Sequence, residues 1–407
     1  MDRTILHCDM NGFFASVELL DHPELIHRPM AVCGNPDNRH GIILAKNQIA
    51  KEYGVTTAET LWQARKKCPD LCCVPPHMHK YKHYSQVINE IYNRYTDMVE
   101  PFSIDESWLD VTASMNLFGS GKDIADAIRE TVKKETGLTL SAGVSFNKIF
   151  AKMGSEYKKP DATTVISREN YKHILWPLPV SQLFFVGKVS AEKLKKSGIH
   201  TIGALALCEK SFLVALLGKQ GSLIHDYANG RDMEPVAKFS QLRKARSIGN
   251  GITFKRNLLG QEDIRIAVVG LSDKIAARLR KEKLKASGIK IEIKDPGFQV
   301  ISRQKQLPYA SNISGELINA AMELIQGHWD MEKPIRLLTI TAINLCDETE
   351  EEQLSLVSFL SEDREKSEKI DRTLDSIREK YGNKAISFGR VLNNDIGMTP
   401  DHRDEEE

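Results

Sequence analysis

Two adjacent carboxylates, Asp105 and Glu106, interrupt the apolar, strand-like stretch PFSIDESWLDVT at residues 101–112. Burying an ionised carboxylate without a partner is costly, so a strand that carries two of them needs an explanation. A third acid, Asp9, ends the short apolar stretch at residues 3–9. If the two stretches are neighbouring strands, the three carboxylates meet at one end of a sheet.

Three carboxylates in close proximity cannot all stay ionised unless cations neutralise them. Mg²⁺ binds through a few carboxylates together with substrate phosphates. Two such ions, roughly 4 Å apart, can align an attacking and a leaving oxygen for in-line displacement. The residues alone leave an alternative open, because Asp105 and Glu106 could be turn residues that face water.

The elements around these acids are predicted to form a mixed α/β domain. A helix is expected at residues 13–20, directly after Asp9, and residues 42–54 have the pattern of a strand that passes into a helix. Further helices are expected at 60–69, 79–98 and 122–136, and a further strand at 138–145.

The pattern changes in the second half of the chain. Residues 167–235 indicate short helices interrupted by Gly and Pro, and a basic linker follows at 236–245. Residues 246–347 then indicate strand, helix, two strands, helix and strand, a βαββαβ module. A helix is expected at 362–381, and the final residues, 401–407, are expected to be disordered.

Charge is unevenly distributed, although the whole chain has a net charge of only +1. Residues 236–347 contain 19 Lys and Arg against 11 Asp and Glu, a net charge of +8. Residues 348–407 contain 9 against 17, a net charge of −8. A basic segment followed by an acidic tail is typical of a domain that meets a polyanion, although a solvated charged face would have the same composition.

Composition argues against membrane and disulfide-rich classes. The 407 residues are enough for about two to four domains. No apolar run reaches about 18 residues, so no membrane-spanning helix is expected, and the first residues lack the apolar segment of a signal peptide. The seven cysteines have no zinc-ligand spacing and are expected to be reduced thiols. We therefore expect a cytoplasmic protein without a membrane partner.

The chain resembles the Y family of DNA polymerases, of the bacterial DNA polymerase IV type, over residues 4 to about 346. The resemblance is carried by four motifs in the right order and spacing: HCDMNGFFASVE at 7–18, SIDESWLDVT at 103–112, SAGVSFNKIFAKMGSEYKKPDATTVI at 141–166 and RSIGNGITF at 246–254. It implies a multidomain α/β (α+β) fold, the right-hand polymerase. The expected domains are a palm at 1–10 and 78–166, small fingers at 11–77, a helical thumb at 167–235, a linker at 236–245, a βαββαβ little finger at 246–347 and an acidic tail at 348–407.

The resemblance implies a template-directed, low-fidelity DNA polymerase of the lesion-bypass type, which extends a primer 3′ end by two-metal phosphoryl transfer. Asp9, Asp105 and Glu106 match the family's catalytic, metal-binding carboxylates. Met10 matches the position whose backbone carbonyl completes a metal site. The implied cofactor is Mg²⁺, two ions per active site, with Mn²⁺ as a substitute. The implied partners are primer–template DNA and an incoming dNTP, and the protein is expected to act as a monomer.

A nucleotide site is implied around the aromatic pair Phe13 and Phe14. Phe14 matches the steric gate, where a ring would collide with a ribose 2′-OH and so favour deoxynucleotides. On the residues alone, a core aromatic at the start of a helix is the more economical interpretation of Phe14. Lys159 matches a lysine that reaches the incoming triphosphate, and a cation there suits phosphoryl transfer.

The fingers segment departs from the family pattern at three positions. Ala45, Gln48 and Lys51 stand where the family usually has Ser or Thr, Tyr and Arg. Ala45 lacks the hydroxyl donor, Gln48 lacks the phenol, and Lys51 keeps the charge without the bidentate fork of arginine. The expected result is weaker nucleotide binding or altered discrimination between sugars.

Candidate DNA contacts lie in three segments. Residues 184–205 resemble a helix-hairpin-helix, in which helix N-termini and nearby lysines hold phosphates without reading sequence; a plain helical hairpin is the alternative. Its candidates are Gly187, Lys188 and Lys193. Two lysines spaced i,i+4, Lys148 and Lys152, could face a phosphate backbone or simply solvent. The basic residues around the first little-finger strand, which suit salt-sensitive backbone contacts, are Arg243, Lys244, Arg246, Lys255 and Arg256.

The acidic tail contains the apolar stretch QLSLVSF at residues 353–359. It resembles the short Gln-Leu-x-Leu-Phe peptide by which bacterial polymerases dock on the sliding clamp, with Val where Phe is usual. The candidate clamp contacts are Gln353, Leu354, Leu356, Val357 and Phe359. The alternative is a loose apolar anchor that packs on this protein.

Other functions compatible with parts of the sequence are a catalytically weak DNA-binding adaptor recruited to the clamp, and a two-metal nuclease or cyclase on a related palm. The intact acids at 9, 105 and 106 argue against the adaptor, and Phe14 together with the basic 236–347 module argues against the cyclase.

Overall fold

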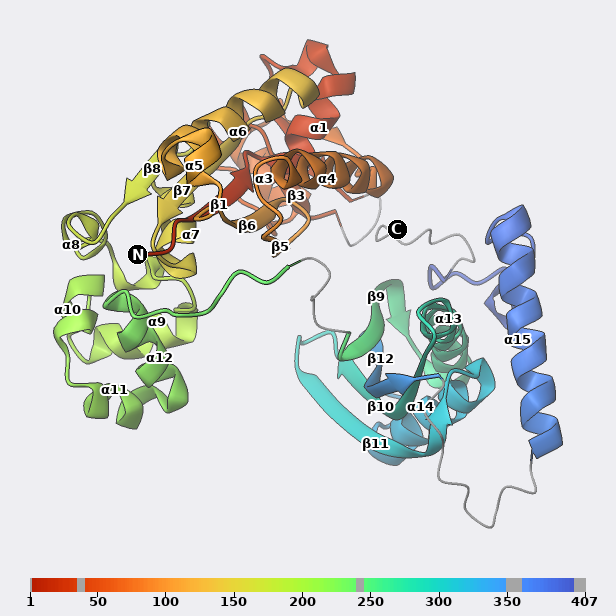
Figure 1. The fold of residues 1–407 in the computed structure, drawn as a ribbon. Helices are drawn as coiled ribbons and strands as arrows, with labels where there is room; N and C mark the ends of the chain where they lie inside the picture. The colour runs from red at the N-terminus through yellow and green to blue at the C-terminus, as the bar shows by residue number, and fades with distance from the viewer. Residues whose placement is uncertain (1, 35–40, 239–244, 349–360, 399–407) are drawn as a thin grey trace. The chain divides into compact units, whose positions relative to one another are not determined.

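The computed structural model describes residues 2–34, 41–238, 245–348 and 361–398 (Figure 1). The chain divides into two compact units, the first mainly residues 1–242 and the second mainly residues 243–407. No described helix is both long and apolar enough to cross a membrane.

The first unit is built on a five-stranded sheet with β1 (Ile5–Met10) in its centre. β1 pairs antiparallel with β6 (Glu106–Asp110) on one side and with β7 (Leu140–Ser145) on the other. The sheet order is completed by β5 (Val99–Pro101) beyond β6 and β8 (Thr163–Ile166) beyond β7. All six residues of β1 are buried, which agrees with the apolar strand expected there.

Helices cover both faces of this sheet. Leu6, Cys8 and Met10 pack in one core cluster with α4 (Met78–Asn93) and α6 (Gly121–Thr136), which lie side by side (Figure 1). On the other face, α7 (Lys148–Tyr157) lies directly on β7. A Cβ on Gly143 of β7 would lie 1.8 Å from the Ala151 carbonyl oxygen, so only glycine allows this approach. Strand alternation therefore turns His7 and Asp9 toward α7.

Residues 11–77, the expected fingers, fold around a three-stranded sheet in the order β3-β2-β4. The strands are β2 (Met30–Cys33), β3 (Ile43–Lys46) and β4 (Cys72–Val74), and the helices are α1 (Phe13–Asp21), α2 (Gln48–Glu52) and α3 (Leu61–Lys67). β3, α1, α2 and α3 match the expected elements, whereas β2 and β4 were not anticipated. Both are short apolar strands without alternation, β2 buried and β4 partly buried, and periodicity does not distinguish them from other apolar runs.

A helical group completes the first unit and shares a core cluster with α7. Its helices are α8 (Tyr171–Leu175), α9 (Lys188–Lys196), α10 (Ile202–Leu207), α11 (Lys210–Leu217) and α12 (Lys219–Ala228). Short helices were expected here, and the structure confirms them.

The second unit has the expected βαββαβ order. Its antiparallel sheet has the order β11-β10-β12-β9 and carries its two helices on one face. The elements are β9 (Ser247–Leu258), α13 (Gly260–Lys281), β10 (Leu284–Lys294), β11 (Val300–Ser311), α14 (Ser314–His328) and β12 (Ile335–Asp347).

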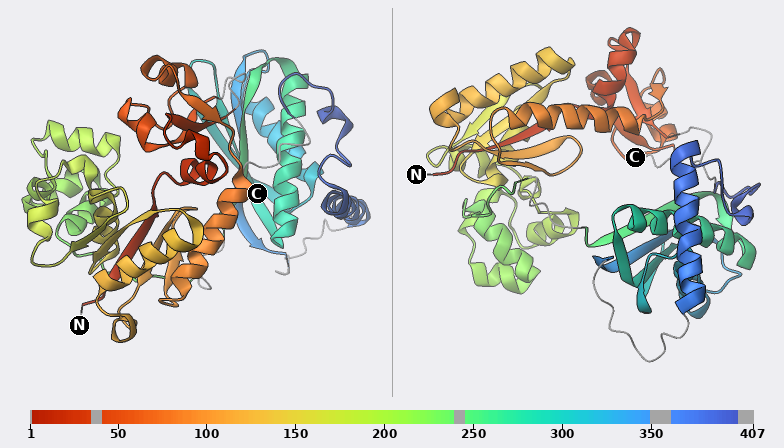
Figure 2. Two further views of the ribbon diagram at one scale, coloured as in Figure 1. Left: turned by 90° about the horizontal axis from the view of Figure 1, so that it is seen from above. Right: turned by 45° about the vertical axis from the view of Figure 1, so that its right-hand side comes forward.

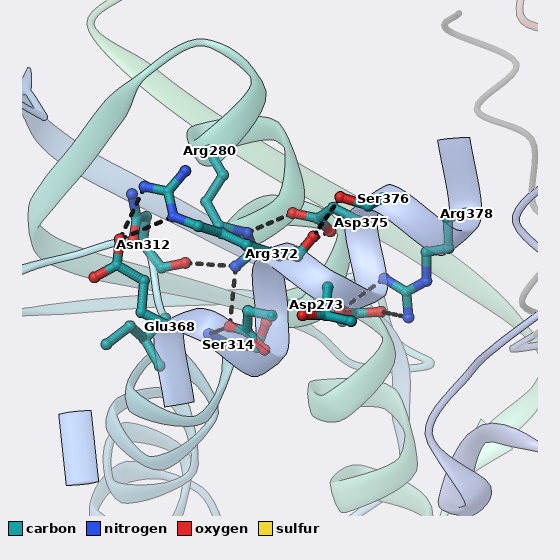
Figure 3. Close-up of polar contacts among 12 residues, drawn as sticks. Asp273, Arg280, Asn312, Ser314, Glu368, Arg372, Asp375, Ser376 and Arg378 are labelled. Atoms are coloured by element: carbon teal, nitrogen blue, oxygen red, sulfur yellow. Dashed lines mark hydrogen bonds and ion pairs between the residues drawn. The ribbon is translucent and has the colours of Figure 1, made fainter. Parts of the chain in front are cut away.

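A third layer covers the helices of the second unit: α15 (Ser361–Tyr381) packs beside α13 on the side away from the sheet (Figure 2). Arg280 of α13 is its main anchor, with Nε 2.6 Å from Asp375 (Figure 3). Its Nη1 lies 3.0 Å from Asp371. Asp371 also accepts the backbone N–H of Ser314 at the start of α14, at 2.7 Å. Downstream of α15, three apolar residues join the core of the unit: Val391, Ile396 and Met398. The helix expected at 362–381 is therefore present, and residues 361–398 are part of the second unit.

Candidate active site

The register of β1 and β6 brings the three acids together. Asp9 lies directly opposite Glu106 in this antiparallel pair, and side chains opposite each other on adjacent strands are neighbours on the same face. Asp105 directly precedes β6, and its carbonyl oxygen accepts the backbone N–H of Met10 at 3.1 Å. The structure thus places Asp9, Asp105 and Glu106 at one end of the sheet, as expected from the sequence.

Two lysines from α7 and the loop after it neutralise two of these acids. Lys152 Nζ contacts the Glu106 carboxylate. Lys159 Nζ lies 2.8 Å from Asp9 Oδ1 and 2.8 Å from Glu156 Oε1. Asp105 has a different partner, since its carboxylate accepts the Ser103 hydroxyl at 2.7 Å.

Burial sets the ionisation of the acids. It raises the pKa of Asp9 to about 7, against the opposing charge of Lys159, and it also raises the pKa of Asp105. Burial alone would raise the pKa of Glu106 as well, but its contacts with His7 and Lys152 outweigh burial and hold that pKa at about 2. The three acids are therefore unequal, and Asp9 carries the most strongly disfavoured negative charge.

A histidine that the sequence analysis did not single out completes this group. His7 is fully buried two residues before Asp9 on the same face of β1, and its Nε2 lies 3.4 Å from Glu106 Oε2. Its Nδ1 forms a 2.8 Å hydrogen bond with the Ser155 hydroxyl. Burial lowers the pKa of His7 to about 4, so the ring is neutral at pH 7. Strand alternation is the sequence signal that could have identified His7, because a residue two positions before Asp9 on a strand lies on the same face.

The donor chemistry of the acids fits divalent magnesium. Carboxylate and backbone carbonyl oxygens are the hard donors that Mg²⁺ prefers, and Asp9 Oδ2 is buried without a hydrogen-bond partner. In the described parts of the chain, however, no three His, Cys, Asp or Glu side chains are already arranged to hold a metal ion. In this conformation Lys152 and Lys159 hold Glu106 and Asp9 instead.

Phe14 lies at the start of α1, five residues after Asp9 in the chain, and is half-buried. Its ring stacks on Tyr81 of α4, with centroids 4.1 Å apart and planes inclined by 9°. Phe13 is different, because it is 3% exposed and belongs to the core cluster with Tyr81. Since its ring is enclosed by protein, we leave the Phe13 side chain out of the nucleotide site.

The three fingers residues that depart from the family pattern lie on β3 and α2. Ala45 is half-buried, while Gln48 and Lys51 are exposed on α2. Asn47 caps this helix by accepting the Ala50 backbone N–H at 2.9 Å. The cap stabilises the start of α2, the helix from which the exposed Gln48 and Lys51 side chains project.

Two of the lysines considered for DNA contact have partners within the protein. The Lys148 side chain is 6% exposed, and its Nζ lies 2.7 Å from Glu100 Oε1 and 4.5 Å from the centre of the Trp108 ring. Lys152 is bound to Glu106. The i,i+4 spacing does place both on one face of α7, but that face meets the sheet. We therefore leave both out of the proposed DNA surface.

The helix-hairpin-helix candidates are exposed. Gly187 is the N-cap of α9, and no side chain caps that helix end. Lys188 and Lys193 are exposed on α9, and a turn through Gly198 leads to α10. The free backbone amides at the start of α9 are suited to an anion.

The little-finger candidates differ in what they can offer. Arg246 and Lys255 are exposed on or beside β9. Arg256 instead binds two carboxylates, those of Asp263 and Asp395, so its charge is already compensated. Arg243 and Lys244 lie outside the described residues, as do the clamp candidates Gln353, Leu354, Leu356, Val357 and Phe359.

Comparison with sequence families gives two matches. The impB/mucB/samB family matches residues 8–156, and the impB/mucB/samB family C-terminal domain matches residues 245–356. The first match contains all three acids and Phe14, and the second begins just before β9.

Curated proteins are similar over almost the whole chain. DNA polymerase IV of Acetivibrio thermocellus is 44% identical over 394 residues, which is 96% of this chain and 98% of that protein. DNA polymerase IV of Clostridium kluyveri is 38% identical, over 96% of this chain and 99% of that protein. DNA polymerase IV 1 of Bacillus subtilis is 36% identical, over 98% and 95% respectively.

A solved structure has the same fold. A chimeric Y-family DNA polymerase superimposes with a TM-score of 0.75 at 22% identity, and the match covers 84% of this chain and 99% of that one.

Proposed function

The chain belongs to the impB/mucB/samB family, the Y-family DNA polymerases of the DNA polymerase IV type, and is a DNA-directed DNA polymerase; we propose that it extends a primer 3′ end by two-metal phosphoryl transfer. The same membership supports lesion-bypass synthesis, and we propose that this synthesis has low fidelity. The observation that carries the proposed mechanism is the pairing of Asp9 with Glu106 across β1 and β6, with Asp105 beside them.

Members of this family depend on divalent metal ions, and the proposed ligands here are Asp9, Asp105 and Glu106 with the Met10 carbonyl. Two Mg²⁺ ions, or Mn²⁺ in their place, would neutralise the triphosphate and favour the ionised primer 3′-OH. The protein's own contribution is to hold the acids on rigid strands, and the unpartnered Asp9 Oδ2 supports a ligand there.

Lysine exchange is the second part of the proposal. Lys159 neutralises Asp9 in the structure described here, and we propose that it turns to the triphosphate when the nucleotide binds. A charge-assisted contact to phosphate is stronger than a neutral hydrogen bond, and phosphoryl transfer depends mainly on such positioning. Lys152 keeps Glu106 ionised in the meantime, consistent with its low pKa.

Phe14 is the proposed steric gate, and Ala45, Gln48 and Lys51 are the proposed fingers contacts to the nucleotide. The exposed positions of Gln48 and Lys51 support contact with a ligand. Primer–template DNA is proposed to contact Gly187, Lys188 and Lys193 in the first unit and Arg246 and Lys255 in the second. We also propose that the chain acts as a monomer and that residues 353–359 dock on the sliding clamp.

Primer extension tests the proposal. Wild-type protein and the Asp105→Ala, Glu106→Ala double variant are given a primed template, dNTPs and Mg²⁺, and DNA binding is measured in parallel. We expect extension by wild type alone and binding by both. Binding without extension by wild type would reject polymerase activity in favour of the adaptor.

A further inference from the structure

Helices α1 and α4 are in contact, and each brings two residues spaced i,i+4 to this contact. α1 contributes Phe14 and Glu18; α4 contributes Tyr81, and His77 stands one turn earlier at its N-cap. Residues four apart lie on the same side of a helix. The two pairs therefore form one compact group of an aromatic stack and a polar cluster.

The Tyr81 ring provides the surface on which Phe14 rests. The two rings are nearly parallel, 9° apart in inclination and 4.1 Å between centroids. Tyr81 is 0% exposed, so its ring has little room to move unless its neighbours move. Any change in the plane of Tyr81 would be passed to the Phe14 ring.

The Tyr81 hydroxyl is held from two directions. It donates to Glu18 Oε1, and it accepts the backbone N–H of His77 at 3.1 Å. Its burial and its bond to Glu18 raise the pKa of the phenol, so it stays a donor at neutral pH. A tyrosine fixed at its hydroxyl and at its ring has one orientation.

Glu18 is unusual because its carboxylate is 0% exposed. His77 Nδ1 lies 3.0 Å from each of its oxygens, and Lys80 Nζ lies 4.0 Å from Oε2. A buried carboxylate is costly unless it is paired and hydrogen-bonded, and an apolar residue at this position of α1 would avoid that cost. The carboxylate therefore needs a reason beyond packing.

We propose that Glu18 is a positioning residue for sugar discrimination, which fixes Tyr81 and through it the plane and position of the Phe14 ring. The inference rests on the proposed function of Phe14 as the steric gate. A gate discriminates by a collision with the 2′-OH, so its selectivity depends on how little the ring can retreat. Without the hydrogen bond to Glu18 the Tyr81 ring can tilt, and the Phe14 ring can then move away from the 2′-OH of a ribonucleotide.

The test is single-nucleotide insertion by the full-length chain, with dGTP or GTP opposite a template cytosine. The measured quantity is the ratio of kcat/KM for the two nucleotides. Tyr81→Phe removes only the hydroxyl, and Glu18→Gln removes the charge at nearly constant volume. Tyr95→Phe is the matched control. It also removes a tyrosine hydroxyl beside the same core cluster, but that hydroxyl forms a 2.9 Å hydrogen bond with Thr131 and not with Glu18.

We expect Tyr81→Phe to lower the dGTP-to-GTP ratio by about threefold to tenfold, the size of one lost hydrogen bond. Glu18→Gln keeps an oxygen that accepts the Tyr81 hydroxyl but removes the charge that strengthens this bond, so it should lower the ratio by a smaller factor. Most of the change should appear as faster GTP insertion. Tyr95→Phe should keep the wild-type ratio. In a Phe14→Ala background, Tyr81→Phe and Glu18→Gln should cause no further loss, because the ring that they position is gone.

Three results would overturn the inference. One is a wild-type ratio in both Tyr81→Phe and Glu18→Gln while Phe14→Ala lowers it. Another is an equal loss with and without Phe14, which would show that the two residues act independently of the gate. The third is an unchanged ratio in Phe14→Ala, which would show that Phe14 is not a steric gate. In that case dGTP insertion by the wild type would still support the polymerase activity.

Discussion

Lys159 Nζ lies 2.8 Å from Asp9 Oδ1, so the residue proposed to reach the triphosphate is bound to a residue proposed to hold metal. The two groups neutralise each other in this structure. A metal-bound triphosphate would supply a cation to Asp9 and an anion to Lys159 at the same time. The ion pair thus keeps the Lys159 ammonium next to the proposed triphosphate position and the Asp9 carboxylate next to the proposed metal position.

Replacing Lys159 should weaken nucleotide use. We expect Lys159→Ala to lower kcat/KM for dNTP insertion by about tenfold to a hundredfold, as loss of a hydrogen bond to a charged group costs about 1.5–3 kcal/mol. Steady-state insertion kinetics measure it. Lys158→Ala is the control, because it removes an exposed lysine from the adjacent position; an equal effect in both variants would show that only general charge matters.

Removing the charge of Asp105 should stabilise the protein while abolishing activity. Burial raises the pKa of Asp105, so its ionised form is disfavoured in the folded state. Asp105→Asn keeps an oxygen to accept the Ser103 hydroxyl and removes the charge. We expect a higher Tm than wild type by calorimetry in EDTA, together with no primer extension. A lower Tm would mean that the charge is compensated in the folded protein.

Asp9 should make metal-free stability depend on pH. Its folded-state pKa of about 7 lies above the ordinary value of 3.8, so the folded state binds the proton more tightly. Its stabilising contribution is therefore present below about pH 4 and is lost as pH rises through 7. Asp9→Asn removes this loss, so its stability relative to wild type should increase between pH 4 and pH 7. Denaturant unfolding in EDTA measures it, and a difference that does not change with pH would contradict it.

The fingers residues should limit nucleotide affinity. A triple variant, Ala45→Ser, Gln48→Tyr and Lys51→Arg, supplies the hydroxyl, the phenol and the bidentate guanidinium. We expect the KM for dNTP to fall by about tenfold, as two or three hydrogen bonds are added at roughly 0.5–1.5 kcal/mol each. Lys51→Met should raise the KM. An unchanged KM in the triple variant would show that these positions do not contact the nucleotide.

Arg280 should hold the C-terminal segment in place. Its side chain is 3% exposed and pairs with the buried Asp371 and the partly exposed Asp375, so Arg280→Leu removes the ion-pair partner of a buried carboxylate, at a cost of about 3–5 kcal/mol. Arg372 is the control: its side chain is 47% exposed and pairs with Glu348 and Glu368, and Arg372→Leu should cost less than about 1 kcal/mol. Unfolding of the second unit and proteolysis within residues 361–398 report the difference. Equal effects would contradict the anchor.

The carboxylate site could be predicted from sequence because it depends on local pattern. The apolar run that ends at Asp9 and the strand-like stretch around Asp105 and Glu106 specify strands, and antiparallel pairing then sets the register. The same logic gave the βαββαβ order of the second unit, where each element has a clear period. The family motifs supplied the roles, which strand pattern alone does not give.

Contacts that depend on how helices approach the sheet could not be predicted. The i,i+4 spacing of Lys148 and Lys152 shows that they share a face of α7 but not that the face meets Glu100 and Glu106. The packing of α15 against α13 could not be predicted for a related reason. Its sequence is strongly polar, and it binds through ion pairs to α13 rather than through an apolar stripe (Figure 3).

The central claim is that Asp9, Asp105 and Glu106 receive two metal ions when Lys152 and Lys159 give way. The most direct measurement is a crystal structure with primer–template DNA, a non-hydrolysable dNTP and Mn²⁺, with the metals located by anomalous scattering. We predict two Mn²⁺ peaks bound by these acids, with Lys159 on the triphosphate. A bound nucleotide with no Mn²⁺ at the acids, and with both lysines still on Glu106 and Asp9, would contradict the account.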